Sequence, residues 1–353
     1  MIATLSDASP LALAGFDAVI DVRSPAEFAD DHLPGAINLP VLDDEERARI
    51  GTIYVQQSRL LARRLGAALV ARNIAGHLEQ RLADRPGAFA PLVYCWRGGQ
   101  RSGAMATVLD QVGWRVTVLA GGYRTYRRRV TAKLYDEACP LSLILLDGAT
   151  GVAKTDILQR VAGLGGQVLD LEGLAAHRGS LFGALPGQPQ PTQKMFESRL
   201  LAALAALEPG KPVLIEAESS KVGEINLPPG LWKAMTAAPR LKLIAPRDAR
   251  AAYLLEAYGD VTANPALLED ILNRLPTHHG RERRDAWRGL AARSAWLELV
   301  ESLIANHYDP GYERSARPGG TAALGELSLP DLSPASRQGA AAQCLDLMKD
   351  FSA

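Results

Sequence analysis

The sequence predicts an α/β protein with two domains, each built on a parallel sheet that helices cover on both faces. Three observations support this fold class. Short apolar runs alternate with segments of helical pattern, as in chains whose parallel strands are joined by helices. Two of these runs lead into glycine-rich loops that a helical segment follows. The chain has 353 residues, of which 47% are hydrophobic, and this is enough for two buried cores.

The first domain is expected over residues 1–130. Residues 24–27 begin a helix, because they supply a serine cap, a proline at the first helical position and an acidic residue in the first turn. Helical patterns follow across residues 44–83 and again across 103–111. The strands of this domain are expected at residues 17–23, 92–94 and 115–119.

The second domain is expected over residues 140–318, after a helical linker at 131–139. Its first strand, residues 141–146, is strongly apolar and leads into a loop and a helix. Residues 319–353 are rich in alanine, glycine, proline and serine, and we expect a loosely packed C-terminal tail with one helix near 340–349. Further strands of the second domain are expected at residues 167–171, 212–217 and 241–245.

The composition excludes several classes of protein. Lysine plus arginine and aspartate plus glutamate are equal at 39 each, which argues against a surface coated in basic charge but leaves room for a local basic patch. There is no apolar stretch of membrane-spanning length and no signal peptide pattern, so we expect a cytoplasmic protein without membrane association. The sequence does not indicate an oligomeric state. The cysteines are too few and too far apart for a disulfide framework: Cys95, Cys139 and Cys344.

Cys95 is the first candidate for a catalytic residue. It ends the apolar run 91–94 and opens the glycine-rich stretch 96–102, which leads into a helical segment. This arrangement directs backbone N–H groups and a positive helix end at the sulfur, which lowers a thiol's pKa and favours the nucleophilic thiolate. Arg97 and Arg101 add positive charge and can bind an oxyanion, although a structural salt bridge is the alternative for either. The sequence therefore predicts covalent chemistry at Cys95, with a small buried side chain as the alternative.

Three further segments accompany the cysteine loop. They are Asp-Val-Arg at 21–23, His-x-Pro-Gly-Ala-x-Asn at 32–38 and Gly-Gly-Tyr at 121–123. In this combination residues 1–130 resemble a rhodanese-like sulfurtransferase domain. In that family the cysteine carries a persulfide or an equivalent adduct, so the resemblance implies this role for Cys95.

A second interpretation of the same loop stays open. Cys95 to Arg101 also fits Cys-x5-Arg followed by serine, the pattern of cysteine-dependent phosphatases, some of which share this fold. A thiolate in an anion cradle suits phosphate as well. However, Tyr94 stands where the phosphatase pattern has histidine, and no carboxylate can be assigned as a general acid. A phosphatase and a generic sulfurtransferase are therefore the alternatives for this domain.

The loop after the first strand of the second domain fits most of a phosphate-binding pattern. That pattern is Gly-x-x-x-x-Gly-Lys-Ser/Thr between a strand and a helix. Ala153 replaces the second glycine, and its methyl group either crowds a phosphate or requires a helical backbone angle. A helix start with a solvated lysine is the alternative, and the substitution leaves nucleotide binding and hydrolysis open. The residues that we expect to bind a phosphate or diphosphate are Gly148, Thr150, Gly151, Lys154 and Thr155.

Polar side chains follow two other strands of this domain. Glu216 and Glu218 end an apolar strand and could lie near a Mg²⁺ ion at the phosphate loop, with a structural carboxylate as the alternative. His177 and Arg178 come after another strand. Because loops at the carboxyl ends of parallel strands build the sites of α/β proteins, we expect these two residues to contact an anionic substrate. No cysteine and histidine spacing predicts a resident metal centre.

The densest basic cluster is interleaved with Tyr123 and Tyr126. Such a cluster can contact RNA phosphates while the tyrosines stack on bases. A solvated linker helix is the alternative, but confined clusters in a neutral protein favour RNA. A second basic cluster lies at residues 281–288. The arginines of the first cluster are Arg124, Arg127, Arg128 and Arg129.

The order of these parts along the chain is distinctive. The cysteine loop reads Cys-Trp-Arg-Gly-Gly at 95–99, and the phosphate loop is followed by Asp-Leu-Glu-Gly-Leu at 170–174 and His-Arg-Gly-Ser at 177–180. A late His-Tyr-Asp-Pro occurs at 307–310. Together these features make about residues 5–315 resemble the tRNA 2-selenouridine synthases.

The resemblance implies a bacterial transferase that modifies the wobble uridine of tRNA. The family replaces the sulfur of 2-thiouridine at tRNA position 34 with selenium from selenophosphate, and it also transfers a geranyl group from geranyl diphosphate to that sulfur. These compounds are then co-substrates, and the expected partners are thiolated tRNA and a selenophosphate supplier. By position Cys95 matches the family's essential cysteine, and residues 148–155 match its phosphate loop. A pocket for the geranyl chain is expected, but the sequence does not identify its residues.

Overall fold

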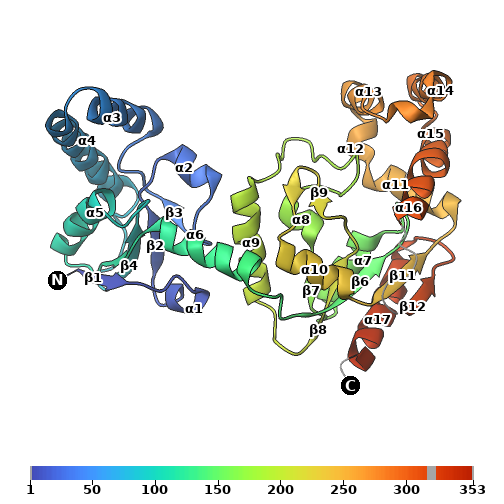
Figure 1. Ribbon diagram of the computed structural model, residues 1–353, viewed down its shortest axis with the longest axis horizontal. Helices are drawn as coiled ribbons and strands as arrows, with labels where there is room; N and C mark the ends of the chain where they lie inside the picture. Colours follow the sequence, from blue (N-terminus) through green and yellow to red (C-terminus); the bar gives the residue numbers. More distant parts are fainter. Residues whose placement is uncertain (1, 316–322, 352–353) are drawn as a thin grey trace. The chain divides into compact units, whose positions relative to one another are not determined.

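The chain forms two compact units, each with its own five-stranded parallel sheet (Figure 1). The computed structural model describes residues 2–315 and 323–351. The first unit consists of residues 1–137 together with 191–205, and the second of residues 138–190 together with 206–353. The predicted fold class, two α/β domains with parallel sheets, is confirmed.

The first unit is built on β1 (Ala3–Leu5), β2 (Ala18–Asp21), β3 (Ile37–Asn38), β4 (Pro91–Tyr94) and β5 (Thr117–Leu119). Their order in the sheet is β1-β5-β4-β2-β3, and every neighbouring pair is parallel. The central strands β2 and β4 are buried because they are apolar along most of their length. Parallel pairing brings their carboxyl ends to one edge of the sheet, and the cysteine loop begins there.

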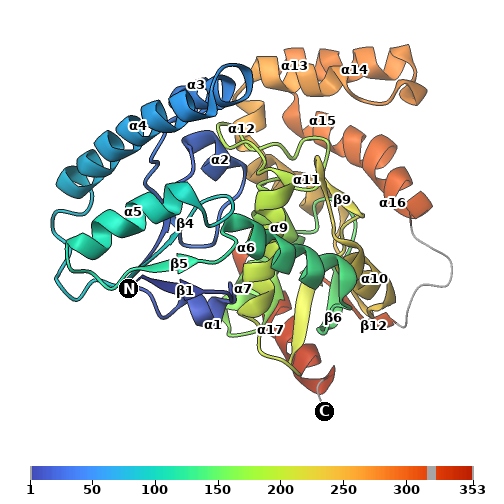
Figure 2. The ribbon, with the colours of Figure 1, turned by 60° about the vertical axis from the view of Figure 1, so that its left-hand side comes forward.

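Helices of the first unit begin where the sequence supplies caps. Ser24 and Glu27 form the predicted capping box of α2, and Ser58 caps α4 after a break in the long helical pattern. The second helix of that pattern, α4, lies beside the preceding helix α3 in both views (Figures 1 and 2). The helices are α1 (Pro10–Leu13), α2 (Pro25–Asp30), α3 (Asp44–Gln56), α4 (Arg59–Gln80), α5 (Gln100–Gln111) and α6 (Tyr123–Thr131), which continues as the π-helix η1 (Ala132–Asp136).

One helix joins the first unit from a distant part of the sequence. Helix α9 (Gln193–Ala205) lies in sequence between strands of the second unit, yet it packs beside α6 and η1 (Figure 2). The buried carboxylate of Glu197 accepts hydrogen bonds from Arg127 of α6 and from the hydroxyl of Tyr135, the latter at 2.6 Å. The sequence-based boundaries place this segment in the second domain. The structure differs because the contacts that recruit α9 are long-range and leave no local pattern.

The second unit is built on β6 (Ser142–Asp147), β7 (Val168–Leu169), β8 (Pro212–Glu216), β11 (Arg240–Ile244) and β12 (Ala323–Ser328). Their order is β12-β11-β6-β8-β7, and all neighbouring pairs are parallel. The predicted strands near 141–146, 167–171, 212–217 and 241–245 are therefore present. An antiparallel pair, β9 (Lys221–Val222) and β10 (Ile225–Asn226), stands apart from this sheet.

Helices of the second unit fall into two groups. The first group consists of α7 (Lys154–Gly163), α10 (Pro229–Ala237) and α17 (Pro334–Phe351), which contact strands of the sheet, together with α8 (Leu171–Ala175), which contacts β9, and α11 (Arg247–Ala257), which contacts α12 and α15. The other forms a helical lobe with its own core, which includes Leu268, Trp287 and Leu299. Within the described residues no helix is long and apolar enough to cross a membrane. The lobe consists of α12 (Gly259–Thr262), α13 (Pro265–Asn273), the 3₁₀ helix η2 (Thr277–His279), α14 (Arg281–Ala292), α15 (Trp296–Leu303), the π-helix η3 (Ile304–Tyr308) and α16 (Asp309–Ser315).

The segment that the sequence sets apart as a loose tail is part of the second unit. Strand β12 pairs with β11, and α17 packs against α7, the helix that follows the phosphate loop. Ala341 and Cys344 of α17 are fully buried in the core that includes Ile157 and Val161 of α7. The alanine-rich composition conceals this role because small side chains permit close helix packing without a strong apolar pattern. Residues 316–322 and 352–353 lie outside the described residues.

Replacing Ala341 by phenylalanine is expected to destabilise the second unit by about 1–3 kcal/mol, because the new ring must enter a filled core. Urea denaturation of the purified protein should show a lower midpoint. The matched control is Ala342→Phe, since Ala342 lies on the exposed face of the same helix. Equal midpoints for the two variants would show that α17 is a loose appendage.

Candidate functional site

Cys95 lies at the carboxyl end of β4, immediately before the loop that leads into α5. Its Sγ accepts a hydrogen bond from the N–H of Gly99 at 3.3 Å and lies 3.2 Å from the hydroxyl oxygen of Ser102. Burial opposes ionisation of the thiol, but the hydrogen bonds from Ser102, Gly99 and Arg97 outweigh it and hold the pKa of Cys95 below its usual value. The structure therefore builds the thiolate-stabilising loop that the sequence predicts.

The cysteine side chain faces a concave polar mouth. Cys95 is 4% exposed and packs into the core of the first unit, yet it also lines a pocket of about 640 Å³. Arg97 is exposed at this pocket. Arg101 has the structural role that the sequence left as its alternative, because its guanidinium pairs with Glu27 at 2.7 Å. Arg47 pairs with the same carboxylate at 2.8 Å. Arg47 and Arg101 nevertheless bring positive charge to the pocket that Cys95 lines.

A buried cluster supports the cysteine loop from behind. Arg23, 1% exposed, pairs with Asp21 at 2.6 Å, and its guanidinium lies 4.1 Å from the ring centre of Tyr123. The backbone N–H of Tyr123 donates to the carbonyl of Cys95 at 2.8 Å. Gly122 precedes it with φ 59°, and a Cβ there would lie 2.1 Å from the same carbonyl oxygen. The Asp-Val-Arg and Gly-Gly-Tyr segments therefore hold the loop in place, and only glycine fits at position 122.

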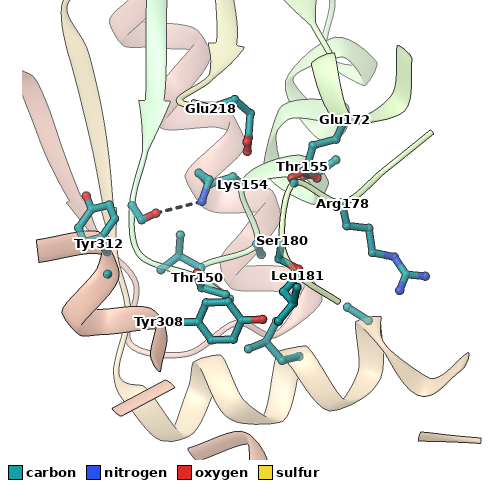
Figure 3. A pocket seen from close by; sticks show the side chains of 18 of the residues that line it. Thr150, Lys154, Thr155, Glu172, Arg178, Ser180, Leu181, Glu218, Tyr308 and Tyr312 are labelled. Carbon is teal, nitrogen blue, oxygen red and sulfur yellow. Dashed lines mark hydrogen bonds between the residues drawn. The ribbon is translucent and has the colours of Figure 1, made fainter. Parts of the chain in front are cut away.

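The phosphate loop runs from the end of β6 to the start of α7. Lys154 Nζ donates to the carbonyl of Gly148 at 2.9 Å, so its side chain lies along the loop (Figure 3). Ala153 adopts the left-handed conformation that the missing glycine would favour, with φ 61° and ψ 34°. This costs about 1–2 kcal/mol for a residue with a side chain. Ala153 is 4% exposed and belongs to the core of the second unit, which helps to offset the strain.

Three glutamates gather beside this loop. Thr155 donates a hydrogen bond to Glu172 at 2.9 Å, and a Cβ on Gly179 would lie within 3.0 Å of carboxylate oxygens of both Glu172 and Glu218. Burial and the charge of Glu218 raise the pKa of Glu172 to about 7. Burial also raises the pKa of Glu218, although the charge of Lys154 opposes this. The carboxylates at this edge therefore bind protons more readily than isolated glutamates do.

Glu216 has a different position from Glu218. Its side chain is fully buried, and one oxygen accepts hydrogen bonds from the backbone N–H groups of Leu171 at 3.0 Å and Glu172 at 3.3 Å. Its other oxygen has no hydrogen-bond partner among the described residues. Burial, followed by the charges of Glu172 and its acidic neighbours, raises the pKa of Glu216 well above its usual value. Glu216 thus fixes the start of α8, whereas Glu218 reaches the pocket at the phosphate loop.

That pocket has a volume of about 740 Å³ and unites most of the predicted residues of the second unit. Arg178 lines it and forms two 3.1 Å hydrogen bonds with Asp260. His177 is absent from its lining, and its Nδ1 instead accepts from the N–H of Gly179 at 3.1 Å. Burial lowers the pKa of His177. Among the sequence candidates at the pocket, Figure 3 shows Thr150, Lys154, Thr155, Arg178 and Glu218.

Sequence reasoning missed several residues of the pocket. Glu172 directly follows a predicted strand, and this position at a sheet edge was a usable signal. The lobe contributes His307 and Tyr308, to which the late His-Tyr-Asp-Pro segment gave no role at a pocket, and Tyr312, for which no local pattern exists. Burial and the neighbouring histidine charges lower the pKa of His307 to about 4, so its imidazole is neutral at pH 7. Within residues 2–315 and 323–351, no three histidine, cysteine or acidic side chains are arranged to hold a metal ion.

The basic cluster of α6 divides into structural and exposed members. Arg127 pairs with Glu197 and lies 4.0 Å from Asp31, so it stabilises the packing of α9. Arg129 is half-buried. Arg124 and Arg128 are exposed and keep their guanidinium groups at the surface. Only part of the predicted RNA-binding set is therefore available to a partner.

The hydrogen bonds to Cys95 predict how the reactivity of its thiol depends on pH. Ser102→Ala removes a donor that favours the thiolate, so the pKa of Cys95 should rise and alkylation by iodoacetamide at pH 7 should slow several-fold. Mass spectrometry of the alkylated peptide over a pH series should place half-maximal reactivity at a higher pH. Thr107→Ala is the matched control, because it removes an exposed hydroxyl from the same helix. An unchanged profile for Ser102→Ala would refute this account of the thiol.

Comparison with known proteins supplies the family. Residues 7–129 match the model of the rhodanese-like domain, and residues 141–270 match that of the tRNA 2-selenouridine synthase AAA domain. The chain is 31% identical to tRNA 2-selenouridine synthase of Shewanella halifaxensis, over 84% of this chain and 87% of the relative. It is 33% identical to the enzyme of that name from Alcanivorax borkumensis, over 84% and 88% of the two chains. A third relative of the same name, from Cupriavidus pinatubonensis, is 33% identical over 83% and 87%. Since these matches run through both units and both glycine-rich loops, the chain belongs to the tRNA 2-selenouridine synthase family.

Proposed function

We propose that this enzyme modifies tRNA by replacing the sulfur of 2-thiouridine at wobble position 34 with selenium from selenophosphate. In the proposed route geranyl diphosphate first alkylates that sulfur. Membership of the family supports the modification of tRNA. The observation that carries the two-step route is the pocket over the phosphate loop, because it combines groups that bind a diphosphate with a wall of aromatic side chains.

The first step belongs to the phosphate-loop pocket. The thiocarbonyl sulfur of the base attacks C1 of geranyl diphosphate, so that a C–S bond forms and the C–O bond to diphosphate breaks. Diphosphate leaves with the bonding electrons, and the base releases its N3 proton. Lys154 and the N–H groups at the start of α7 bind the departing anion, whose charge grows as the bond breaks. In this step the phosphate loop binds the leaving diphosphate while the geranyl group is transferred to sulfur.

The second step is the exchange of sulfur for selenium, to which we assign Cys95. At C2 of the base a C–Se bond to selenophosphate forms while the C–S bond breaks, and geranyl thiolate leaves. Water then cleaves the Se–P bond and releases phosphate. The stabilised thiol of Cys95 and the exposed charge of Arg97 share one pocket, and Arg101 adds its charge there while it holds Glu27. A nucleophile beside cations suits an anionic selenium donor.

A Mg²⁺ ion fits beside the phosphate loop. Diphosphate at Lys154 adds negative charge next to Glu172 and Glu218, whose pKa values burial already raises. A divalent cation relieves this repulsion, and hard oxygen ligands are available from Thr155 and the two carboxylates. Mg²⁺ keeps several waters and usually binds one or two carboxylates plus substrate phosphates, so it needs no complete protein cage. When bound, it would neutralise charge on the diphosphate.

For the tRNA we propose Arg124 and Arg128 as contacts to backbone phosphates. Both side chains are exposed on α6, which begins directly after the Gly-Gly-Tyr segment that supports Cys95. Arg127 is left out of this set because its ion pairs fix α9. The backbone N–H of Arg124 donates to the carbonyl of Trp96 at 3.2 Å, and this contact with the cysteine loop suits arginines that guide a wobble base towards it.

Cys95→Ala is expected to abolish 2-selenouridine while S-geranyl-2-thiouridine is still formed, because the diphosphate pocket lies in the other unit. Mass spectrometry of nucleosides from tRNA of cells that carry only the variant measures both products. Cys139→Ala is the control, since it removes a cysteine from outside the pocket that Cys95 lines. Normal selenation by Cys95→Ala would exclude this residue from the exchange, and turnover of aryl phosphates lost in Cys95→Ser would favour the phosphatase.

Lys154→Ala is expected to weaken binding of geranyl diphosphate roughly 10- to 100-fold, the usual loss for a hydrogen bond to a charged group. Titration calorimetry of the full chain measures the dissociation constant. Lys233→Ala, which removes an exposed lysine from α10, should leave it unchanged. Equal affinities for wild type and Lys154→Ala would show that the diphosphate is bound elsewhere.

A further inference from the structure

A narrow apolar cavity adjoins the phosphate-loop pocket in the second unit. Its volume is about 60 Å³, and its walls come from α11, α12, α13 and α15. Four residues line both this cavity and the larger pocket, so the two spaces share one wall. These residues are Thr150, Leu254, Tyr258 and Tyr308.

The chemistry of the cavity is that of a hydrocarbon site. Its lining has no charged side chain, and its polar side-chain groups are hydroxyls and the indole N–H of Trp296. The hydroxyl of Tyr258 lies 3.1 Å from that of Ser180, so a partner within the protein already satisfies it. The remaining walls include Val261, Leu268, Trp296 and Leu299. A ribose or a base in this cavity would leave its polar atoms without hydrogen bonds, whereas a branched hydrocarbon would not.

The position of the cavity determines what kind of ligand it can take. Thr150 belongs to the phosphate loop itself, and its neighbours Lys154 and Gly148 line the adjoining pocket. One ligand that occupies both spaces must carry an anionic head and an apolar tail. We propose that the cavity receives the end of the prenyl chain of a prenyl diphosphate whose head lies at the phosphate loop. This rests on the proposed use of geranyl diphosphate and adds the site of its tail.

The cavity is too small for a ten-carbon chain by itself. The first part of the chain therefore lies in the larger pocket along Leu254, Tyr258 and Tyr308, and the distal isoprene unit enters between α13 and α15. Each buried methylene group strengthens binding roughly three- to fourfold. Geranyl diphosphate should consequently bind more than about tenfold more tightly than dimethylallyl diphosphate, which ends before the cavity.

A cavity-filling substitution tests this directly. Leu299→Phe extends a buried side chain of α15 into the cavity, and Leu297→Phe makes the same change at a position on the same helix that is 48% exposed. Calorimetric titration of the full chain with geranyl diphosphate should show roughly tenfold weaker binding for Leu299→Phe alone. Inorganic pyrophosphate should bind wild type and both variants equally, because it occupies only the phosphate loop.

A second measurement needs no substitution in the core. Trp296 is half-buried in the cavity wall, so geranyl diphosphate should change its fluorescence and pyrophosphate should not. The Trp296→Phe variant identifies the part of the signal that comes from this residue. If geranyl diphosphate binds but neither Leu299→Phe nor Trp296 responds, the tail lies elsewhere and this proposal is wrong while the proposed function stands. If wild type binds neither geranyl diphosphate nor pyrophosphate, the proposed function fails and the tail site with it.

Discussion

Both sites depend on backbone segments that approach more closely than a Cβ atom allows. At Gly122 a side chain would collide with the carbonyl of Cys95, and at Gly148 it would lie 2.7 Å from the carbonyl of Leu243. The first contact fixes the cysteine loop against the start of α6, and the second fixes the phosphate loop against β11. Free N–H groups can point at a thiolate or a phosphate only when the loop around them is held this firmly.

Charge is arranged differently around the two loops. Around Cys95 the positive groups Arg97 and Arg101 accompany hydrogen bonds that lower the thiol's pKa, so the nucleophile is favoured in its ionised form. Around Lys154 the carboxylates of Glu172 and Glu218 have raised pKa values because they are buried together. The second site therefore gains when a cation or a proton arrives with the diphosphate. This difference suits the proposed route, in which an anionic selenium donor binds beside Cys95 in one unit and diphosphate is expelled in the other.

Local patterns predicted the parts of the structure that depend on local chemistry. The cysteine loop, the phosphate loop and their strands follow from residue types within ten positions of each other, whereas Ala153 adopts a left-handed angle where we expected a helical one. The partners of Arg127 in α9, the packing of Ala341 and the tyrosines of the pocket depend on contacts across the sequence. Contacts between residues far apart in the sequence leave no hydrophobic periodicity and no fixed motif spacing that could be recognised. The family resemblance therefore implied a pocket for a prenyl chain, but no sequence pattern indicated where it would lie.

The apolar cavity also bears on why a phosphate loop carries alanine at its second glycine position. A nucleotide-hydrolysing site must position water at the terminal phosphate, whereas transfer of a hydrocarbon group from a diphosphate must exclude water from C1 of the chain. Ala153 turns its methyl group into the core and leaves the N–H groups at the start of α7 in place, so the loop keeps the geometry that anion binding needs. With Leu254 and Tyr308 at the same wall, the loop faces a largely apolar surface on the side where the tail would lie. The phosphate loop can thus keep its backbone geometry while its neighbours suit the proposed alkylation.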